Sequence, residues 1–469
     1  MEDSKALHVV VFPWLAMGHI IPFFHLSEHL AQKGHKVSFV STPRNLQRLP
    51  KIPQNLSYLL TVVSLPLPHV EALPPHAESS TDIPPKQAPF LKKAFDLLEL
   101  PLKNFLENTA PDWIIYDYAS HWLPPLAAKL GISRAYFGPF TAASLAFVVP
   151  PASEMDGGDL RLKPEDFTVV PKWVPFESNV KYHLHELLAV ADDSLSGIES
   201  GTSDTVRFAV SIGESDVVGI RSCVEFEPEW FNLLEVIHRK PVLPVGFLPQ
   251  LVEEGGDEID ERWVGIKEWL DKQRLESVVY VALGSEATLS REQLTELALG
   301  LEQSELPFFW VLRKLPWSNQ DALEMLPDGF EERVEGRGMV YVGWAPQVKI
   351  LSHKSVGGFL THCGWNSVIE GLGSGRVLIL FPVLNDQGLN ARLLHGKKLG
   401  VEIARNELDG SFTHDSVAKS VKLAVVEEEG ESLRATAKEM KCLFGDTNRN
   451  DRHIDAFIRH LEENRRSPR

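Results

Sequence analysis

The fold of this chain is decided by HVVVFPWLAMGHIIPFFHLSEHLAQKGHKVSFVS, residues 8–41. Residues 8–12 are a short apolar run rich in β-branched side chains, which is typical of a strand buried in a parallel sheet. Residues 20–32 carry apolar side chains at helical spacing, and Gly34 fits a helix end. A second β-branched run follows at residues 36–41. The stretch predicts a β-α-β unit, and right-handed repetition of such units predicts a doubly wound α/β domain.

The same alternation continues along most of the chain. Further strands are predicted at 113–116, 134–137, 278–283, 308–312, 339–342 and 377–381. Helices are predicted at 90–106, 123–130, 291–303, 387–398, 415–428, 431–444 and 452–463. Residues 65–90 are interpreted as a loop, and the weakly patterned residues 150–206 as insertions near a cleft.

The composition changes around residues 241–260, which are rich in Pro and then in Gly and acidic residues. This change predicts a boundary between two domains, and 469 residues suit two domains of ordinary size. We predict an N-terminal domain over 1–245, a linker over 246–260 and a C-terminal domain over 261–450. Two α/β domains that face each other across a cleft are the expected architecture.

Charge and cysteine content restrict the partners and the compartment. The net charge of −17 argues against nucleic acid or an anionic membrane as the main partner. The three cysteines are odd in number and widely spaced, which fits a reducing compartment better than a disulfide framework or a zinc pattern. The N-terminus lacks the pattern of a signal peptide, and no apolar run reaches the roughly 18 residues of a membrane span. We therefore expect a cytoplasmic protein without stable membrane insertion.

A second informative stretch lies at residues 344–387, WAPQVKILSHKSVGGFLTHCGWNSVIEGLGSGRVLILFPVLNDQ. Its apolar residues 358–360 predict a buried strand, and a helix then opens at Asn366 and Ser367. Unpaired N–H groups at such a helix start, with His362 beside them, suit a phosphate.

Other side chains of this stretch suit the remaining parts of a nucleotide sugar. Trp344 offers a ring on which a base can stack. Glu370 and Asp386, with Gln387, can accept hydrogen bonds from sugar hydroxyls. The residues of this stretch thus predict a nucleotide-sugar site.

Polar residues also follow predicted strands elsewhere, at His19, Asp117 and Ser285. In open α/β sheets ligands bind beyond the carboxyl ends of the strands, so this shared placement is informative. His19 has two interpretations: a helix-start residue bonded to a carbonyl, or a general base whose far ring nitrogen is held by Asp117. In the second, the acid fixes the tautomer and stabilises the imidazolium that forms when the base takes a proton.

Metal binding has little support in the sequence. His183 and His185 have the spacing of one strand face, but a third ligand is not evident. The chain contains no Asp-x-Asp, which metal-dependent sugar transferases use to hold a diphosphate through a divalent ion. We therefore predict no metal. Four aromatic residues either line an apolar acceptor pocket or pack in the core: Trp14, Phe90, Trp122 and Phe140.

Residues 344–387 also resemble the signature box of plant family 1 UDP-dependent glycosyltransferases, the secondary-product glycosyltransferases. The stretch has the length of that box, its opening Trp, its closing Asp-Gln and the motif THCGWNS. The similarity extends to GHIIP near the start, VVYVALGS and the closing helix. A departure occurs at Arg376-Val377, where many members carry a residue followed by Pro.

The resemblance implies a fold, a reaction and a set of residue roles. The fold would be two facing Rossmann-like domains, the GT-B fold, with residues 451–469 forming a helix that packs back on the first domain. The reaction would be an inverting, metal-independent hexosyl transfer in which a UDP-sugar is a co-substrate and no cofactor takes part. His19 would be the general base and Asp117 its partner. UDP contacts are implied at Ser285, Trp344, Ala345, Gln347, His362, Asn366, Ser367 and Glu370. Donor-sugar contacts are implied at Thr141, Trp365, Asp386 and Gln387.

Within the family, the phrases FPWLAMGHIIPF, VSFVSTPRN, DYASHWLPPLAAKLGIS and VALGSEA resemble a subgroup that extends sugars on existing glycosides. The expected function is transfer of glucose from UDP-glucose to a sugar hydroxyl of a flavonoid or terpenoid glycoside, by a monomer. UDP-rhamnose as donor and an aglycone hydroxyl as acceptor are alternatives. A nucleotide-sugar-binding protein without catalysis is the alternative from another class.

Overall fold

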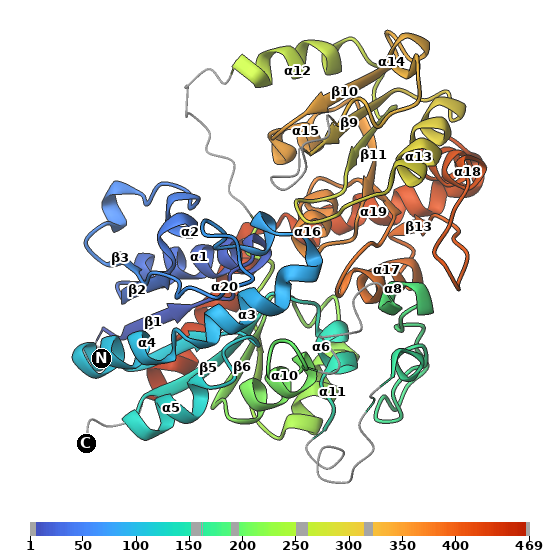
Figure 1. Cartoon of the computed structure of the whole chain (residues 1–469). Helices are drawn as coiled ribbons and strands as arrows, with labels where there is room; N and C mark the ends of the chain where they lie inside the picture. Colours follow the sequence, from blue (N-terminus) through green and yellow to red (C-terminus); the bar gives the residue numbers. More distant parts are fainter. Residues whose placement is uncertain are drawn as a thin grey trace.

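A computed structural model describes residues 6–151, 161, 163–188, 197–249, 261–313 and 322–465. The predicted linker lies mostly outside the described residues, as do parts of the predicted insertions at 150–206 and the last four residues of the chain. Two parallel sheets form the framework, which confirms the predicted doubly wound α/β class. Figure 1 shows the first sheet and its helices in blue and green, and the second in yellow and orange.

The N-terminal sheet has seven parallel strands in the order β3-β2-β1-β4-β5-β6-β7. Their bounds are β1 His8–Phe12, β2 Lys36–Ser41, β3 Leu60–Ser64, β4 Trp113–Tyr116, β5 Ser133–Gly138, β6 Val217–Ile220 and β7 Val242–Pro244. The central strands are buried on both faces, as expected for apolar runs in a parallel sheet. The strand order reverses between β1 and β4, and the loops after these two strands therefore lie where ligands usually bind in open α/β sheets.

The C-terminal sheet has six parallel strands in the order β10-β9-β8-β11-β12-β13. Their bounds are β8 Val278–Ala282, β9 Phe308–Leu312, β10 Gly338–Val342, β11 Val356–Thr361, β12 Val377–Leu380 and β13 Gly400–Glu402. The corresponding reversal lies between β8 and β11, which pair directly. The loops after these two strands therefore mark the corresponding ligand-binding position of the second domain.

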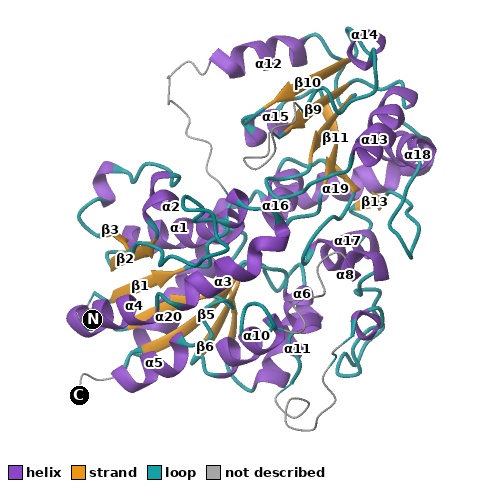
Figure 2. Ribbon diagram, viewed as in Figure 1, coloured by secondary structure: helices purple, strands orange, loops and turns teal. Residues whose placement is uncertain are grey.

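Helices cover both sheets (Figure 2). Those of the N-terminal domain are α1 Met17–Gln32, α2 Pro43–Gln47, α3 Ala88–Asp96, α4 Glu99–Thr109, α5 Leu123–Leu130, α6 Ala142–Val148, α8 Leu184–Leu188, α10 Asp204–Gly213 and α11 Pro228–His238. Those of the C-terminal domain are α12 Glu261–Asp271, α13 Arg291–Gln303, α14 Phe330–Arg333, α15 Gln347–Ser352, α16 Trp365–Gly373, α17 Gln387–Gly396, α18 His414–Val425 and α19 Glu431–Phe444. Among the described residues, no helix combines the length and the apolar composition that crossing a membrane requires.

The predicted helix over residues 90–106 is wrong, because the structure divides it into α3 and α4. Pro101 explains the break. Its nitrogen cannot donate to the carbonyl of Leu97, and its ring would collide with that carbonyl in a continuous helix. The short strand β7 falls in the stretch where the composition indicated the approach to a linker, and it has only three residues, one of them Pro244.

A last helix, α20 (Thr447–Glu463), returns to the N-terminal domain after α19. Figure 1 shows this red helix beside the blue and teal strands of the first sheet. Its apolar face, Ile454, Phe457, Ile458 and Leu461, is buried in the same cluster as residues of β1 and α1. Trp113 donates its indole N–H to the carbonyl of Leu461 at 2.9 Å. The first domain thus contains residues from both ends of the described chain.

The two domains meet through an aromatic cluster. Phe226 and Phe247 come from the N-terminal domain, and Trp365 and Phe444 come from α16 and α19. The rings of Phe247 and Phe444 stack with centroids 3.9 Å apart, and the ring of Trp365 lies 6.0 Å from that of Phe444. These contacts hold the start of α16 against the N-terminal domain.

Candidate active site

The loops after β1 and β4 bring His19 and Asp117 together. Nδ1 of His19 lies 2.8 Å from Oδ2 of Asp117, although the two residues are 98 positions apart in sequence. The Asp117 side chain is fully buried and the His19 side chain is 13% exposed. Backbone N–H groups of Trp14 and Ala119 also donate to the Asp117 carboxylate. The carboxylate is therefore held in place and in turn orients the imidazole, leaving Nε2 as the free position of the ring among the described contacts.

Aromatic rings surround His19. The ring of Phe140 lies 5.2 Å from the imidazole and that of Tyr118 lies 5.8 Å from it. Phe208 stacks on Tyr118 at 4.5 Å and extends this apolar wall. Of the four aromatic residues predicted for a pocket or the core, Phe140 lies at His19, whereas Trp122 packs in the core on Phe12. Sequence reasoning missed Tyr118, which lies in the quoted phrase over 117–133 but received no role, and Phe208, which lies outside every quoted phrase.

Across the domain junction, the first turn of α16 faces the same region. Its N-cap residue, Gly364, has no side chain that could accept from the first N–H groups, so these donors are available to an anion. Asn366 lies in this turn and contacts the N-terminal domain on two sides. Its Nδ2 donates to the carbonyl of Gly18 at 3.4 Å, and its Oδ1 accepts from the guanidinium of Arg221. The helix start thus lies next to the residue that precedes His19.

His362 is packed between two glycines, Gly284 and Gly364, which lie in the loops after β8 and β11. A Cβ at Gly284 would lie 2.5 Å from its Nε2, and a Cβ at Gly364 would lie 2.4 Å from it. Burial lowers the pKa of His362 to about 4, so the ring is neutral at neutral pH. Its Nδ1 is buried without a hydrogen-bond partner among the described residues. Ser285 is exposed in the turn that follows Gly284.

The predicted nucleoside side of the site forms one hydrogen-bonded group. Gln347 donates through Nε2 to Glu370 at 2.7 Å and to Ser367 at 3.1 Å, and it accepts from the hydroxyl of Tyr280 at 3.2 Å. Burial raises the pKa of Glu370, and the hydrogen bond from Gln347 opposes that rise. The Glu370 carboxylate is therefore held in a fixed orientation, and this role for Gln347 was not visible in the sequence.

Trp344 and Ala345 lie on the same side of the C-terminal domain. The Trp344 side chain is 53% exposed, which leaves ring surface open to a planar ligand. The guanidinium of Arg262, from α12, lies 5.5 Å from the centre of the Trp344 ring. Ala345 is buried beside it.

The four predicted donor-sugar residues have different surroundings in the structure. Burial raises the pKa of Asp386, and the hydrogen bond from Asn390 and the charge of His19 oppose that rise. Oε1 of Gln387 already accepts from the backbone N–H groups of Val383 and Leu384, at 2.9 and 2.8 Å. Contrary to the expectation that Gln387 accepts from sugar hydroxyls, only its Nε2 donor remains for a ligand.

Trp365 does not place its indole with the other predicted residues. The ring is buried in the aromatic cluster between the domains, and its Nε1 donates to the carbonyl of Arg221 at 2.6 Å. Only the backbone N–H of Trp365, in the first turn of α16, remains for a ligand. Its side chain instead holds α16 against the N-terminal domain.

Thr141 reaches this region through Asn390, which the sequence analysis missed. Oδ1 of Asn390 accepts from the hydroxyls of Thr141 at 3.2 Å and Ser144 at 3.0 Å. Its Nδ2 donates to Asp386 at 2.8 Å and to the carbonyl of Cys363 at 3.0 Å. The Asn390 side chain is fully buried, with both of its donors and its acceptor oxygen engaged. It therefore orients Asp386 within its own domain and connects it to Thr141 and Ser144 of the N-terminal domain.

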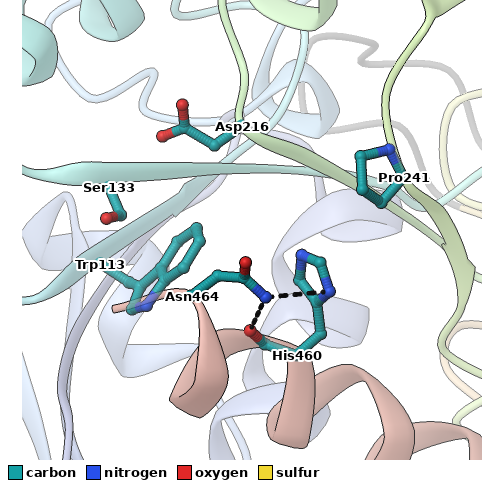
Figure 3. Close-up of a pocket in the computed structure, with 6 residues that line it drawn as sticks. All are labelled: Trp113, Ser133, Asp216, Pro241, His460 and Asn464. Carbon is teal, nitrogen blue, oxygen red and sulfur yellow. Dashed lines mark hydrogen bonds between the residues drawn. The ribbon is translucent and has the colours of Figure 1, made fainter. Parts of the chain in front are cut away.

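A separate pocket lies at the opposite edge of the N-terminal sheet (Figure 3). It is lined by Trp113, Ser133, Asp216, Pro241, His460 and Asn464. These residues lie at the amino ends of β4 to β7 and on α20, whereas His19 and Asp117 lie beyond carboxyl ends. His183 and His185 are not part of any three-ligand cluster among the described residues.

The arrangement defines a class of protein. Two facing Rossmann-like domains, with a His–Asp pair on one side of their junction and a helix start without a side-chain cap on the other, are the arrangement of a GT-B glycosyltransferase. A family model described as UDP-glucoronosyl and UDP-glucosyl transferase matches residues 243–429. UDP-glycosyltransferase 91C1 of Arabidopsis thaliana is 59% identical over 460 residues, 98% of this chain and 97% of that protein. The chain therefore belongs to the plant family 1 of UDP-dependent glycosyltransferases, which confirms the resemblance.

Other relatives have more specific names. Soyasaponin III rhamnosyltransferase of Glycine max is 41% identical, over 99% of this chain and 97% of that protein. Cyanidin 3-O-galactoside 2''-O-xylosyltransferase FGGT1 of Actinidia chinensis var. chinensis is 35% identical, over 98% of this chain and 99% of that protein. The solved structure of Phytolacca americana UGT2 with UDP-2fluoro-glucose and pterostilbene has a TM-score of 0.74 at 25% identity, over 98% of this chain and all of that one. The predicted GT-B fold is confirmed.

Proposed function

We propose that this protein transfers glucose from UDP-glucose to a sugar hydroxyl of a flavonoid or terpenoid glycoside, with inversion at the anomeric carbon. The observation that carries the proposal is the contact across the domain junction. His19, paired with Asp117 at 2.8 Å, directly follows Gly18, and the carbonyl of Gly18 accepts from Asn366 in the first turn of α16. The proposed proton acceptor and the helix start proposed to bind the diphosphate thus lie on opposite sides of one small region.

The chemistry follows from this arrangement. Nε2 of His19 takes the proton of the acceptor hydroxyl, while Asp117 stabilises the imidazolium that forms. The acceptor oxygen attacks the anomeric carbon from the face opposite to UDP, and the bond from that carbon to the diphosphate oxygen breaks. The N–H groups and side chains at the start of α16 stabilise the negative charge that develops on the leaving UDP. A single displacement of this kind inverts the anomeric configuration and calls for no metal ion.

The remaining predicted residues receive the other parts of the donor. Trp344 stacks on the uracil and Glu370, held by Gln347, accepts from the ribose hydroxyls. Ser367, His362 and Ser285 add hydrogen bonds to the diphosphate. Asp386 accepts from hydroxyls of the transferred sugar, and Gln387 donates to them through Nε2.

The acceptor class rests on the subgroup phrases and on the relatives. The name of the Actinidia relative describes transfer of a sugar to a sugar hydroxyl of a cyanidin glycoside. The apolar wall of Phe140, Tyr118 and Phe208 beside His19 suits the flat or fused rings of such a compound. UDP-rhamnose is the second donor candidate, because the Glycine max relative is named a rhamnosyltransferase.

An acceptor screen tests the proposal. Each aglycone is paired with its monoglucoside and offered with UDP-glucose and with UDP-rhamnose, and products are followed by mass spectrometry. We expect transfer from UDP-glucose to the monoglucosides. Transfer only to aglycones or only from UDP-rhamnose would replace the finer assignment, and binding of UDP-glucose without transfer to any acceptor would favour a non-catalytic protein.

A variant of His19 tests the mechanism. His19→Ala should lower kcat by about 100- to 10,000-fold, the usual contribution of a general base, while affinity for UDP changes little. His29→Ala, on the same helix, is the control and should keep full activity. Full turnover by His19→Ala would overturn the mechanism. A monomeric state, checked by light scattering, and a cytoplasmic location remain further predictions.

A further inference from the structure

Arg221 connects the two domains at the first turn of α16. It directly follows β6, and only 4% of its surface is exposed. Its Nε donates to the carbonyl of Phe247 at 2.7 Å and its Nη2 to that of Leu248 at 3.1 Å. Its Nη1 donates to Oδ1 of Asn366, and its own carbonyl accepts from the indole of Trp365. The guanidinium and the backbone carbonyl of Arg221 therefore both hold the start of α16.

The charge of Arg221 lacks a directly bonded counter-ion among the described residues. Its hydrogen bonds to Phe247, Leu248 and Asn366 all go to neutral oxygen atoms. Burial lowers its pKa to about 9, with Glu370 acting in the opposite direction. A buried cation of this kind favours an anion nearby.

The contact with Asn366 has a consequence for the direction of its amide. An Asn side chain has one acceptor end and one donor end, and a guanidinium can only donate. Arg221 therefore fixes Oδ1 of Asn366 toward itself, which turns Nδ2 the other way. Nδ2 donates to the carbonyl of Gly18 at 3.4 Å, a long hydrogen bond that a phosphate oxygen can replace.

We propose that Arg221 is a positioning residue for the donor diphosphate, because its guanidinium fixes the Asn366 amide so that Nδ2 and not Oδ1 faces the phosphate oxygens. The inference rests on the proposed function, which places the UDP diphosphate at the start of α16. Without Arg221 the amide is free to turn, and an oxygen facing a phosphate repels it.

The test compares UDP with uridine, which lacks the phosphates, as ligands of the full chain in calorimetric titrations. Arg221→Gln should weaken UDP binding by about 10-fold or more, the usual scale for a hydrogen bond to a charged group, and change uridine binding by less than about 2-fold. A merely structural role would weaken both ligands equally, and that result would overturn the inference.

A double-mutant cycle with Asn366→Ala tests the route of the effect. If Arg221 acts through Asn366, adding Arg221→Gln to Asn366→Ala should change UDP affinity by less than about 2-fold. An equal further loss in that background would show that Arg221 acts on the diphosphate by its own charge, and would overturn the positioning role. Should Arg221→Gln not fold, Arg221→Lys takes its place in the same cycle, since it keeps the charge but not the planar fork.

Arg376 offers a matched control at the other end of α16. Its guanidinium is likewise buried and donates to three backbone carbonyls, those of Leu351, His353 and Val356. Arg376→Gln should lower stability without changing the ratio of UDP to uridine affinity. A wild-type chain that binds neither ligand would overturn the proposed function and the inference together, whereas normal UDP binding by Arg221→Gln would overturn the inference alone.

Discussion

Replacing Asn390 by Ala should damage both the domain junction and the reaction. The side chain makes four hydrogen bonds, to Thr141, Ser144, Cys363 and Asp386, at distances from 2.8 to 3.2 Å. A neutral hydrogen bond contributes about 1 kcal/mol and one to a carboxylate about 1.5–3 kcal/mol. Without the amide, the Thr141 hydroxyl can donate to that of Ser144, 2.8 Å away, and the Asp386 carboxylate is half-buried, so part of the loss is recovered. We expect the free energy of unfolding to fall by about 3 kcal/mol.

The assay combines urea unfolding with steady-state kinetics. Because Asp386 loses the donor that orients it, kcat for transfer should fall more than can be explained by the unfolded fraction. Asn108→Ala is the control. Asn108 is an exposed residue of α4 whose side chain donates to the carbonyl of Asn104, and its loss should change stability by less than about 0.5 kcal/mol. A loss below about 1 kcal/mol with normal kinetics for Asn390→Ala would refute the reasoning that this amide holds Asp386.

Three further predictions follow from buried ionisable groups and from one closely packed glycine. Burial raises the pKa of Glu370 above its ordinary 4.5, so UDP-glucose affinity should fall as the pH drops through that raised value. Glu370→Gln should remove this pH dependence. A wild-type affinity that stays constant down to pH 4.5 would contradict the proposed ribose-binding role of Glu370. Burial lowers the pKa values of His25, His238 and His362 from 6.5 to about 4, so the unfolded chain binds protons that the folded chain does not. The stability that these neutral histidines contribute is therefore fully present above pH 6.5 and is lost toward pH 4, by roughly 3 kcal/mol for each histidine. Urea unfolding measures this change, and equal midpoints at about pH 7 and about pH 5 would contradict the predicted pH dependence. Gly284→Ala should abolish UDP binding and lower the free energy of unfolding by about 1–3 kcal/mol, because Gly284 has a φ of +77° and the new Cβ would lie 2.5 Å from the His362 ring. Calorimetric titration and urea unfolding check the two effects. Normal UDP affinity would contradict the close packing of His362 against Gly284 at the proposed site.

Much of the framework was predictable, because burial in a parallel sheet demands uniform apolar runs. The strands at 8–12, 36–41, 113–116 and 308–312 were predicted at their observed bounds for that reason. The same logic led to Asp117, which directly follows β4, and to His19, which lies at the start of the helix after β1, since the residues that follow parallel strands gather at one edge of a sheet. Pattern reasoning needed only the rule that ligands bind beyond the carboxyl ends of parallel strands.

Residues at the domain junction were not predictable in the same way. Asn390 lies within a helix, where a polar residue is usually solvated, and only the position of α6 makes it a buried connector. Arg221 follows a short strand, β6, that the sequence analysis did not find. Trp365 belongs to a recognised motif, yet the direction of its indole depends on aromatic rings contributed by distant segments. What one domain presents to the other is a property of their packing, which periodicity does not encode.

The return of α20 to the first domain constrains the order of folding. Ile454, Phe457, Ile458 and Leu461 complete an apolar core whose other members precede the entire C-terminal domain in sequence. During synthesis, that core cannot close until the ribosome has translated the second domain as well. Until then the apolar residues that α20 covers stay exposed, so a chain truncated before residue 447 should be an aggregation-prone substrate for chaperones.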